Sequence, residues 1–331
     1  MEKECDSILE KIKERKKNTL NFETEVKGLD FESQPTISEF IESFSTVGFQ
    51  ATNVFKGIEE IKKMKNTKIF LGATSNLISS GLRETIRYLI KYNHINVFVT
   101  TGGGIEEDII KTFKPTMLAD FNYKGEELRD NCYNRIGNCV IHSENYAIFE
   151  RWLSKIVDEI TEGYTKENPL IMTPSKFIKL LGERINNPES ILYWAFKNNI
   201  PVYSPAITDG SIGDILTFHK RREVFKLDIV EDIYNINHEA MFEKETSAII
   251  LGCGIVKHHI LNANIFKNGL EHCVLVNTAV EYNGSDAGAS LDEAVSWGKV
   301  KPDFGGIKIH GDATIIFPLM VAGAFGFQNK N

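Results

Sequence analysis

Residues 283–299 hold the side chains with the clearest chemical use. They begin with the loop Asn-Gly-Ser-Asp-Ala-Gly-Ala-Ser, whose glycines and small polar residues suit tight turns with free backbone N–H groups. Ser290 followed by Glu293 predicts a capping box at the start of a short helix, and Gly298 stands where helices commonly end in a left-handed residue. Lys299 follows that end, and Glu293 and Trp297 lie one turn apart on a shared helix face.

Lys299 has two interpretations. A lysine beside an indole and near carboxylates can act as a nucleophile, provided that desolvation lowers its pKa enough to free the amine. A solvated lysine after a helix end is the commoner case, because a cation suits the helix dipole there. Local sequence alone favours the solvated lysine.

Six acidic side chains stand at or near predicted strand ends or loops, so that several of them can converge on one pocket. Carboxylates together with aromatic faces are what a desolvated polyammonium ligand requires. Taken singly, each acid is more simply a helix cap or a solvated charge. The six are Glu106, Glu107, Asp209, Asp214, Asp286 and Glu293.

His258 and His259 follow a Gly-Cys-Gly turn and open a predicted helix. A histidine at such a position is usually structural or solvent-facing, but a neutral one can shuttle a proton. The other histidines are scattered without metal-ligand spacing, so no metal site is predicted.

The elements that must position these residues alternate between strands and helices. Strands are predicted at 68–72, 95–100, 200–203, 248–252, 272–277 and around 307–310. The first is followed by a helix with apolar positions from 78 to 90, and the second by a helix starting near 105. This alternation is typical of βαβ units, and ligands of such sheets collect at the carboxyl ends of the strands.

The middle of the chain is more helical. Helices are predicted around residues 177–185 and 191–198, and the carboxyl terminus closes with a buried helix. An apolar stripe with helical spacing predicts core packing and nothing more; it consists of Tyr146, Phe149, Leu153, Ile156, Val157 and Ile160. We predict one Rossmann-like, doubly wound α/β domain over residues 36–331, with a mainly parallel sheet flanked by helices. Residues 1–35 are predicted to form a mobile, helix-prone arm.

A dinucleotide site is only partly indicated by the residues themselves. No GxGxxG follows the first strand, and Thr101-Gly-Gly-Gly and Gly252-Cys-Gly are fragments of that pattern. Backbone N–H groups at 75–79 can hold a phosphate at a helix start. Ordinary capping of that helix by Ser75 or Asn76 explains the same residues equally well.

Composition excludes several classes of function. The net charge of −7 on 331 residues argues against nucleic acid as the main partner. No apolar run is long enough to cross a membrane, and the charged first residues do not resemble a signal peptide. The five cysteines are odd in number and form no CxxC pair, which predicts reduced thiols in a cytoplasmic protein.

Several blocks of the sequence, in one order from Phe49 to Thr314, resemble deoxyhypusine synthase. The strongest is GSDAGASLDEAVSWGK around Lys299. The others are FQATN, LGATSNLISSGLRETIRYLI, VTTGGGIEEDIIK, NRIGN, SPAITDGSIGD, KHHILNAN and DAT. Because these independent matches cover most of the chain, it is identified as a member of that family.

The resemblance implies an NAD site and a polyamine site. The positions that match NAD contacts are Ser75, Asn76, Leu77, Ile78, Ser79, Thr101, Gly102, Gly103, Glu107, Asp209, Thr278, Ala279, Asp312 and Ala313. Those that match spermidine contacts are Glu106, Glu107, Asp214, His258, Gly284, Ser285, Asp286, Glu293, Trp297 and Lys299. Lys299 and His258 match the catalytic lysine and histidine. His259 is expected only to pack. A Glu293 side chain that caps its own helix would be less free to hold substrate.

The implied reaction moves the 4-aminobutyl group of spermidine to a lysine of the initiation factor five-A precursor. It requires NAD and passes through an imine on the enzyme lysine, in a homotetramer with sites between subunits. Two alternatives stay open. Homospermidine synthase passes the same group to putrescine, and a catalytically weak paralogue would activate a partner subunit, although such paralogues typically lack the lysine.

Two positions depart from the family pattern. Cys253 stands where glycine is common, and Asn283 stands where aspartate is common. The first adds a small side chain near the ligands and the second removes a charge. We expect changed affinity and retained chemistry. The N-terminal arm matches least well, and its position across a neighbouring subunit's site is an analogy with the family.

Overall fold

The computed structural model describes residues 22–327 of the chain. The helical arm predicted for the first residues therefore lies largely outside the described part. From residue 22 onward the arm contains one 3-10 turn, Phe31–Ser33, and runs beside helix α2 (Ile37–Val47), where the Lys27 amide donates to the Thr46 carbonyl at 3.1 Å. Within residues 22–327, no helix combines the length and the hydropathy that a membrane span needs.

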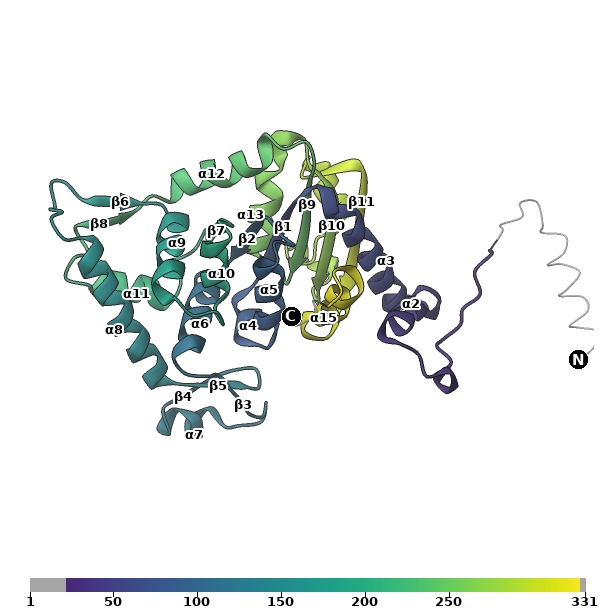
Figure 1. Cartoon of the computed structure of the whole chain (residues 1–331), viewed down its shortest axis with the longest axis horizontal. Helices are drawn as coiled ribbons and strands as arrows, with labels where there is room; N and C mark the ends of the chain where they lie inside the picture. The colour runs from purple at the N-terminus through teal and green to yellow at the C-terminus, as the bar shows by residue number, and fades with distance from the viewer. Residues whose placement is uncertain (1–21, 328–331) are drawn as a thin grey trace, which may run out of the picture.

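Six parallel strands form the central sheet in the spatial order β11-β10-β9-β1-β2-β7 (Figure 1). Their bounds are β1 Lys68–Ala73, β2 Val97–Thr100, β7 Val202–Tyr203, β9 Thr246–Leu251, β10 Leu270–Asn277 and β11 Val300–His310. The chain runs from β1 outward through β2 to β7, then returns to β9 beside β1 and runs outward through β10 to β11. This is the order of a doubly wound Rossmann sheet, and it confirms the predicted fold class.

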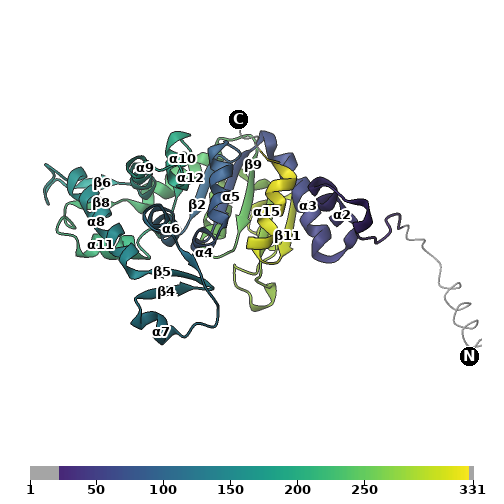
Figure 2. The same cartoon turned by 60° about the horizontal axis from the view of Figure 1, so that its bottom comes forward.

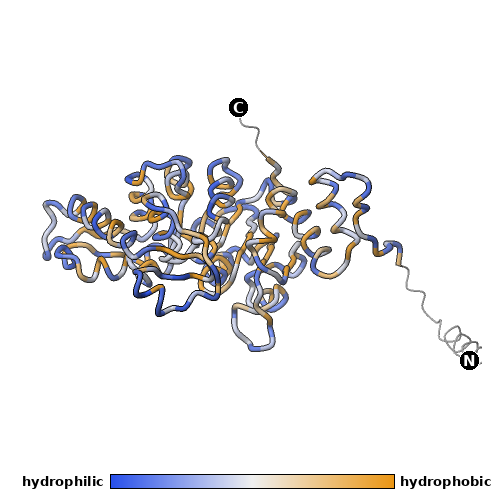
Figure 3. The backbone as a smooth tube through the Cα atoms, turned by 90° about the horizontal axis from the view of Figure 1, so that it is seen from below, coloured by the Kyte–Doolittle hydropathy of each residue, from blue (hydrophilic) through white to orange (hydrophobic). Residues whose placement is uncertain are grey.

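Both faces of the middle of the sheet are covered, which is why strands β1, β2 and β9 are buried along nearly their whole length. In β1, Ile69 and Leu71 pack into one hydrophobic core, while Phe70 packs into the other. The first core contains side chains from helices α3 (Phe49–Lys63), α6 (Gly102–Phe113) and α15 (Ala313–Ala324). The second contains side chains from α12 (Ile229–Met241), α13 (Ile255–Ala263) and α14 (Leu291–Ser296). Figure 3 shows the hydrophobic segments gathered in the middle of the molecule.

The helix predicted over residues 78–90 is two helices, α4 (Ser75–Ser79) and α5 (Leu82–Lys91). The predicted apolar face is nevertheless buried throughout. The break at Ser80 and Gly81 is held from outside, because the Lys111 ammonium on α6 donates to the carbonyls of Ile78, Ser79 and Ser80 at 3.0, 2.9 and 3.0 Å. These carbonyls end α4 and have no partner within their own helix.

The residues between β2 and β9 add a helical layer and two small sheets. Helices α9 (Pro174–Ile185) and α10 (Ile191–Lys197) confirm the two predicted there. Figure 2 shows β4, β5 and α7 projecting from the body. The remaining elements are β3 Met117–Leu118, α7 Gly125–Asp130, β4 Tyr133–Ile136, β5 Cys139–His142, α8 Ser143–Ile160, β6 Leu170–Met172, α11 Ser211–Phe218 and β8 Phe225–Leu227.

Candidate active site

The sheet reverses its order between β1 and β9, and the loops that follow these two strands touch. Gly252 follows β9 with φ +81°, and a Cβ built on it would lie 2.7 Å from Oγ1 of Thr74, which follows β1. A side chain at Gly252 is therefore excluded both by backbone conformation and by space. A doubly wound sheet binds its ligand at the carboxyl edge beside this reversal.

Helix starts converge on the same edge without side-chain caps. Thr74 precedes α4 and Thr101 precedes α6, and neither side chain accepts a hydrogen bond from its helix. A Cβ on Gly103 would lie 3.1 Å from the Ser75 Cβ, so the two helix starts adjoin. The alternative explanation was that Ser75 or Asn76 caps this helix. The residue at the N-cap is Thr74 instead, and no side chain caps the helix. The N–H groups remain available to an anion.

Two buried hydroxyls at this edge lack a partner among residues 22–327. They are Thr101 Oγ1 and Ser204 Oγ, each almost inaccessible to solvent. Thr101 was predicted as a ligand contact, whereas Ser204, directly after β7, was not. Buried polar atoms in native proteins are nearly always satisfied, so these two fit a site that a polar ligand completes. A single serine in the SPAITDG loop carries no sequence signal that would distinguish it.

A group of acids surrounds the start of α6. Glu106 is buried, and its Oε1 accepts the Ile212 amide at 2.8 Å, at the start of α11. Burial raises the pKa of Glu106, and the nearby charges of Glu107 and Asp214 raise it further. Asp214 is exposed and lines a cavity of about 310 Å³. Asp209 lies in the adjoining loop and is also exposed. Glu106 thus caps the neighbouring helix α11, where the backbone amides of Ile212 and Ser211 favour its ionised form and oppose the rise in its pKa.

Tyr146 was predicted to pack in the core and do nothing more; it does pack against the core, but it also makes a polar contact. Its hydroxyl donates to Glu107 Oε1 at 3.1 Å, joining α8 to the acid group on α6. The other residues of the stripe, Phe149 and Leu153 among them, do pack in the core. The signal was present in the sequence, since a tyrosine in an apolar stripe carries a polar tip that needs a partner.

The loops after β10 and β11 reach the same edge. The Ala279 amide donates to the Asn277 side chain at 3.1 Å, and His310 Nε2 lies 3.1 Å from the Thr278 carbonyl oxygen. Asp312 caps α15 and precedes Ala313, accepting from the Thr314 amide at 2.7 Å. One Asp312 oxygen is thus used locally.

Helix α13 starts after β9 and carries the predicted histidine. His258 is exposed, and its Nδ1 lies 3.3 Å from the Asn262 side-chain amide. Burial lowers the pKa of His259 to about 4, with a smaller effect from His258, so that His259 is neutral at neutral pH. This agrees with the packing role predicted for His259. Cys253, in the turn before α13, is a partly exposed free thiol.

Two lysines hold the loop before α14. The Lys257 ammonium donates to the carbonyls of Asp286 and Ala289 at 2.6 and 3.0 Å, and the Lys308 ammonium donates to the Gly288 carbonyl at 2.5 Å. Asp286 Oδ2 is buried and has no hydrogen-bond partner in the described part of the chain. The loop therefore holds the Asp286 carboxylate in place with one oxygen that lacks a hydrogen-bond partner.

Gly284 and Ser285 belong to a turn built by Asn283. The Asn283 side-chain oxygen accepts from the Ser285 amide at 2.9 Å and from its hydroxyl at 2.7 Å. Gly284 takes φ +71°, which glycine adopts without strain. The asparagine thus has a structural use here that needs no charge.

Helix α14 ends in the predicted way and leads directly to Lys299. Gly298 has φ +68°. Ser290 Oγ accepts the Glu293 amide at 3.2 Å, but the return bond of a capping box is absent, so the Glu293 carboxylate is not engaged with its own helix. The box predicted there is half formed, which removes the objection to Glu293 as a ligand. A complete box does occur at Thr36 and Glu39.

The Lys299 side chain is buried, with 8% of its surface exposed, so it is not the solvated lysine that local sequence favours. Its ammonium lies 5.8 Å from the centroid of the Trp297 ring. No carboxylate of residues 22–327 pairs with it. Trp297 itself is 66% exposed, so its outer face is open in the single chain.

Lys299 and the candidate cofactor loops lie at opposite edges of the sheet. The Lys299 carbonyl accepts the amide of Leu270, where β10 begins, whereas the Asn277 carbonyl, where β10 ends, accepts the amide of Gly311. The seven steps from Leu270 to Asn277 span roughly 23 Å at about 3.3 Å per residue. The Asp286 loop itself lies at the carboxyl edge, where Lys257 at the start of α13 holds it. Glu106 and Glu107 follow β2, which β1 and β9 separate from β10.

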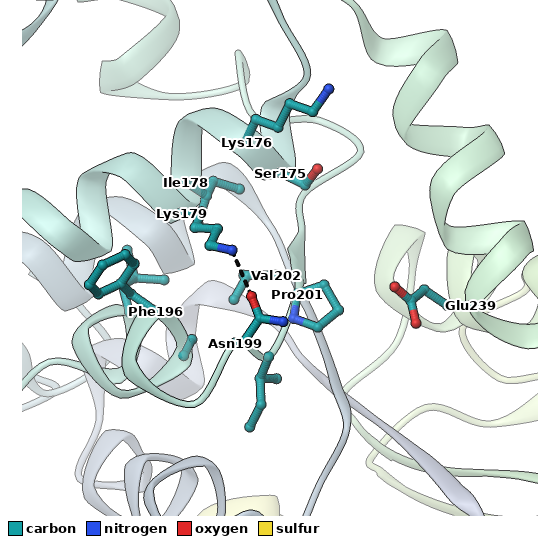
Figure 4. A pocket seen from close by; sticks show the side chains of 12 residues that line it. Ser175, Lys176, Ile178, Lys179, Phe196, Asn199, Pro201, Val202 and Glu239 are labelled. Carbon is teal, nitrogen blue, oxygen red and sulfur yellow. Dashed lines mark hydrogen bonds between the residues drawn. The ribbon is translucent and has the colours of Figure 1, made fainter.

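A separate cavity of about 240 Å³ lies between α9, α10 and the start of β7 (Figure 4). Lys179 donates to Asn199 within it at 2.6 Å. Pro201 and Val202 line it where β7 begins, at the amino edge of the sheet. It contains none of the predicted site residues.

The chain is similar in sequence to known proteins along most of its length. A sequence model of the family described as "Deoxyhypusine synthase" matches residues 39–324. The deoxyhypusine synthase of Encephalitozoon cuniculi is 64% identical, covering 95% of this chain and 94% of the relative. That of Caenorhabditis elegans is 45% identical, covering 91% of this chain and 89% of the relative.

A solved structure is also similar. The crystal structure of an Entamoeba histolytica protein assigned as a deoxyhypusine synthase superposes with a TM-score of 0.68 at 31% identity, covering 91% of this chain and 96% of that one. The family match over residues 39–324 runs from before β1 to the end of α15, so it includes both the uncapped helix starts and the segment that ends in Lys299. The chain therefore belongs to the deoxyhypusine synthase family of transferase enzymes.

Proposed function

We propose that the chain transfers the 4-aminobutyl group of spermidine to a specific lysine of the initiation factor five-A precursor. The observation that carries the proposal is that Lys299 is buried and has no carboxylate partner among the described residues. Helix α14, which precedes Lys299, also leaves the Glu293 carboxylate free of capping. A primary amine that no carboxylate of residues 22–327 pairs with is the nucleophile that imine formation needs.

NAD is the proposed cofactor, and the carboxyl edge fits it. The uncapped starts of α4 and α6 offer N–H groups to a pyrophosphate, and Thr101 offers a buried hydroxyl without a partner. Bound there, NAD would supply a hydride acceptor and, later, a hydride donor. The proposed contacts are those of the family pattern: Ser75, Asn76, Leu77, Ile78, Ser79, Thr101, Gly102, Gly103, Glu107, Asp209, Thr278, Ala279, Asp312 and Ala313.

The polyamine is proposed to bind between two sets of carboxylates. Glu106, Glu107 and Asp214 form one, and Asp286 and Glu293 form the other, with Trp297 beside Lys299. Ammonium groups leaving water need such partners. The Lys299 nitrogen would attack the oxidised carbon of spermidine, forming a C–N bond while 1,3-diaminopropane leaves with its electron pair and a proton. The acceptor lysine would then displace Lys299 from that carbon. His258 is the proposed proton carrier.

We further propose that each site is shared by two copies of the chain, in a homotetramer. The separation of roughly 23 Å along β10 supports this, because a four-carbon lysine stem does not cross it. A second copy that places its α14 against the carboxyl edge of the first would unite both sets of acids and cover Trp297. We also propose a cytoplasmic location, in line with the free thiols of Cys132, Cys139, Cys253 and Cys273.

Co-expression of two inactive variants tests the shared site. Lys299→Ala removes the nucleophile, and Glu107→Gln alters the carboxyl edge. In a mixed pair related by two-fold symmetry, one site receives both changes and the other receives neither. Random mixing should restore about a quarter of the wild-type activity, measured as labelled aminobutyl transfer. If each site lies within one chain, the mixture stays as inactive as the separate variants.

A further inference from the structure

Tyr146 reaches the candidate site from α8, a helix that carries none of the predicted site residues. It lies on α8, in a stripe whose neighbours pack in the core, yet its hydroxyl donates to Glu107 Oε1 at 3.1 Å. Among residues 22–327, Glu107 Oε2 is buried and has no hydrogen-bond partner. One oxygen of the carboxylate is thus held while the other remains to be satisfied.

The surroundings of Glu107 leave this holding role to Tyr146. Lys111 lies one turn further along α6, but its ammonium is committed to three carbonyls at the end of α4. The Ser79 hydroxyl on α4 is close enough to lower the pKa of Glu107, but it donates to the Ser75 carbonyl at 3.3 Å. On the other side are the Glu106 carboxylate and, beyond it, Asp214, which cannot donate when ionised.

We propose that Tyr146 is a positioning residue for Glu107, fixing the carboxylate so that Oε2 faces the cationic amine of the substrate. This inference rests on the proposed function, since it assigns the Glu107 carboxylate to the polyamine. A carboxylate held at one oxygen keeps its orientation in the absence of ligand, and a pre-oriented partner binds an ammonium with less loss of entropy. Tyr146 would not itself touch the reacting atoms.

The bond also affects ionisation. Burial raises the pKa of Glu107, and the bond from Tyr146, the charge of Lys111 and Ser79 oppose that rise. Without the hydroxyl, the pKa of Glu107 rises further, so the carboxylate becomes protonated at a higher pH. Affinity for a cation, which needs the ionised form, is then lost earlier as the pH falls.

The variant Tyr146→Phe tests the inference, because it removes one oxygen and keeps the ring. We expect KM for spermidine to rise roughly tenfold, as for a lost hydrogen bond to a charged group, with kcat changed less than about twofold. The acidic limb of kcat/KM should move to higher pH. Tyr88→Phe is the matched control, since the Tyr88 hydroxyl donates to the Gly326 carbonyl at 3.0 Å and has no link to Glu107.

A double-mutant cycle separates positioning from a general structural effect. Spermidine binding, measured by calorimetry with NAD present, should weaken in Tyr146→Phe and in Glu107→Gln, and the double variant should be no weaker than Glu107→Gln alone. Additive losses, or an equal effect of Tyr88→Phe, would overturn the inference. If the wild type is active and Tyr146→Phe has the same KM for spermidine and the same pH profile, only this inference is overturned. If the wild type transfers no aminobutyl group, the proposed function is overturned as well.

Discussion

Lys299→Arg should abolish aminobutyl transfer, to at least roughly a thousandfold below wild type, while the protein stays folded. Arginine keeps the positive charge and most of the stem, but its guanidinium is not deprotonated in proteins and cannot form the imine. Because Lys299 has no ion-pair partner in residues 22–327, the change breaks no salt bridge. Labelled transfer and thermal unfolding, measured on the same preparation, give the two readouts.

Lys301→Arg is the matched control for this variant. Lys301 lies two residues away and pairs with Glu271 at 2.5 Å, so arginine can replace its charge and its bond. Its activity should be close to wild type. Substantial transfer by Lys299→Arg would mean that another group carries the aminobutyl chain.

Asp108→Asn should have the largest effect on stability, about 4 kcal/mol. Asp108 is 1% exposed, and its carboxylate accepts from Arg83 Nε at 2.8 Å and from the Ser190 hydroxyl at 2.6 Å. It also accepts the amides of Ile191 and Leu192 at 3.0 and 3.1 Å, at the start of α10. An amide removes the charge opposite the buried Arg83 and turns one acceptor into a donor that faces other donors.

Urea unfolding at a fixed protein concentration measures this effect, because stability of an oligomer depends on concentration. Asp303→Asn, at an exposed position of β11, should stay within about 0.5 kcal/mol of wild type. Combining Asp108→Asn with Arg83→Met should recover part of the loss, since no buried charge is then left unpaired. Equal stability of Asp108→Asn and wild type would show that this group of bonds does not anchor α5, α6 and α10.

The central strands could be predicted because strands that are buried on both faces are mostly apolar, whereas only residues 307–310 of the partly exposed β11 were predicted. The runs 68–72 and 248–252 lie within two residues of β1 and β9. The β3–β5–β4 sheet was not predicted, since its strands are short and largely exposed; all of β4 is exposed. The break between α4 and α5 was missed although Ser80-Gly81 marks it, because the apolar spacing continues across it.

The sequence predicts candidate site residues one by one, but it does not predict how they are arranged. Family blocks indicate which side chains matter, and local rules indicate that Gly298 turns the chain before Lys299. Neither the blocks nor the local rules contain the strand order. That order places β9 and β1 between β10, which precedes the Asp286 loop, and β2, which precedes the helix of Glu107. Tyr146 was missed because helical spacing describes the face of a residue and not the polar atom at its tip.

The most direct test of the proposed reaction follows the aminobutyl group of labelled spermidine into purified initiation factor five-A precursor and, separately, into putrescine, with and without NAD. We expect label on one lysine of the protein acceptor, and only when NAD is present. Label in putrescine with none in the protein would contradict it and establish homospermidine synthesis. No transfer to either acceptor by the purified chain would also contradict it, in favour of a subunit that acts through a partner.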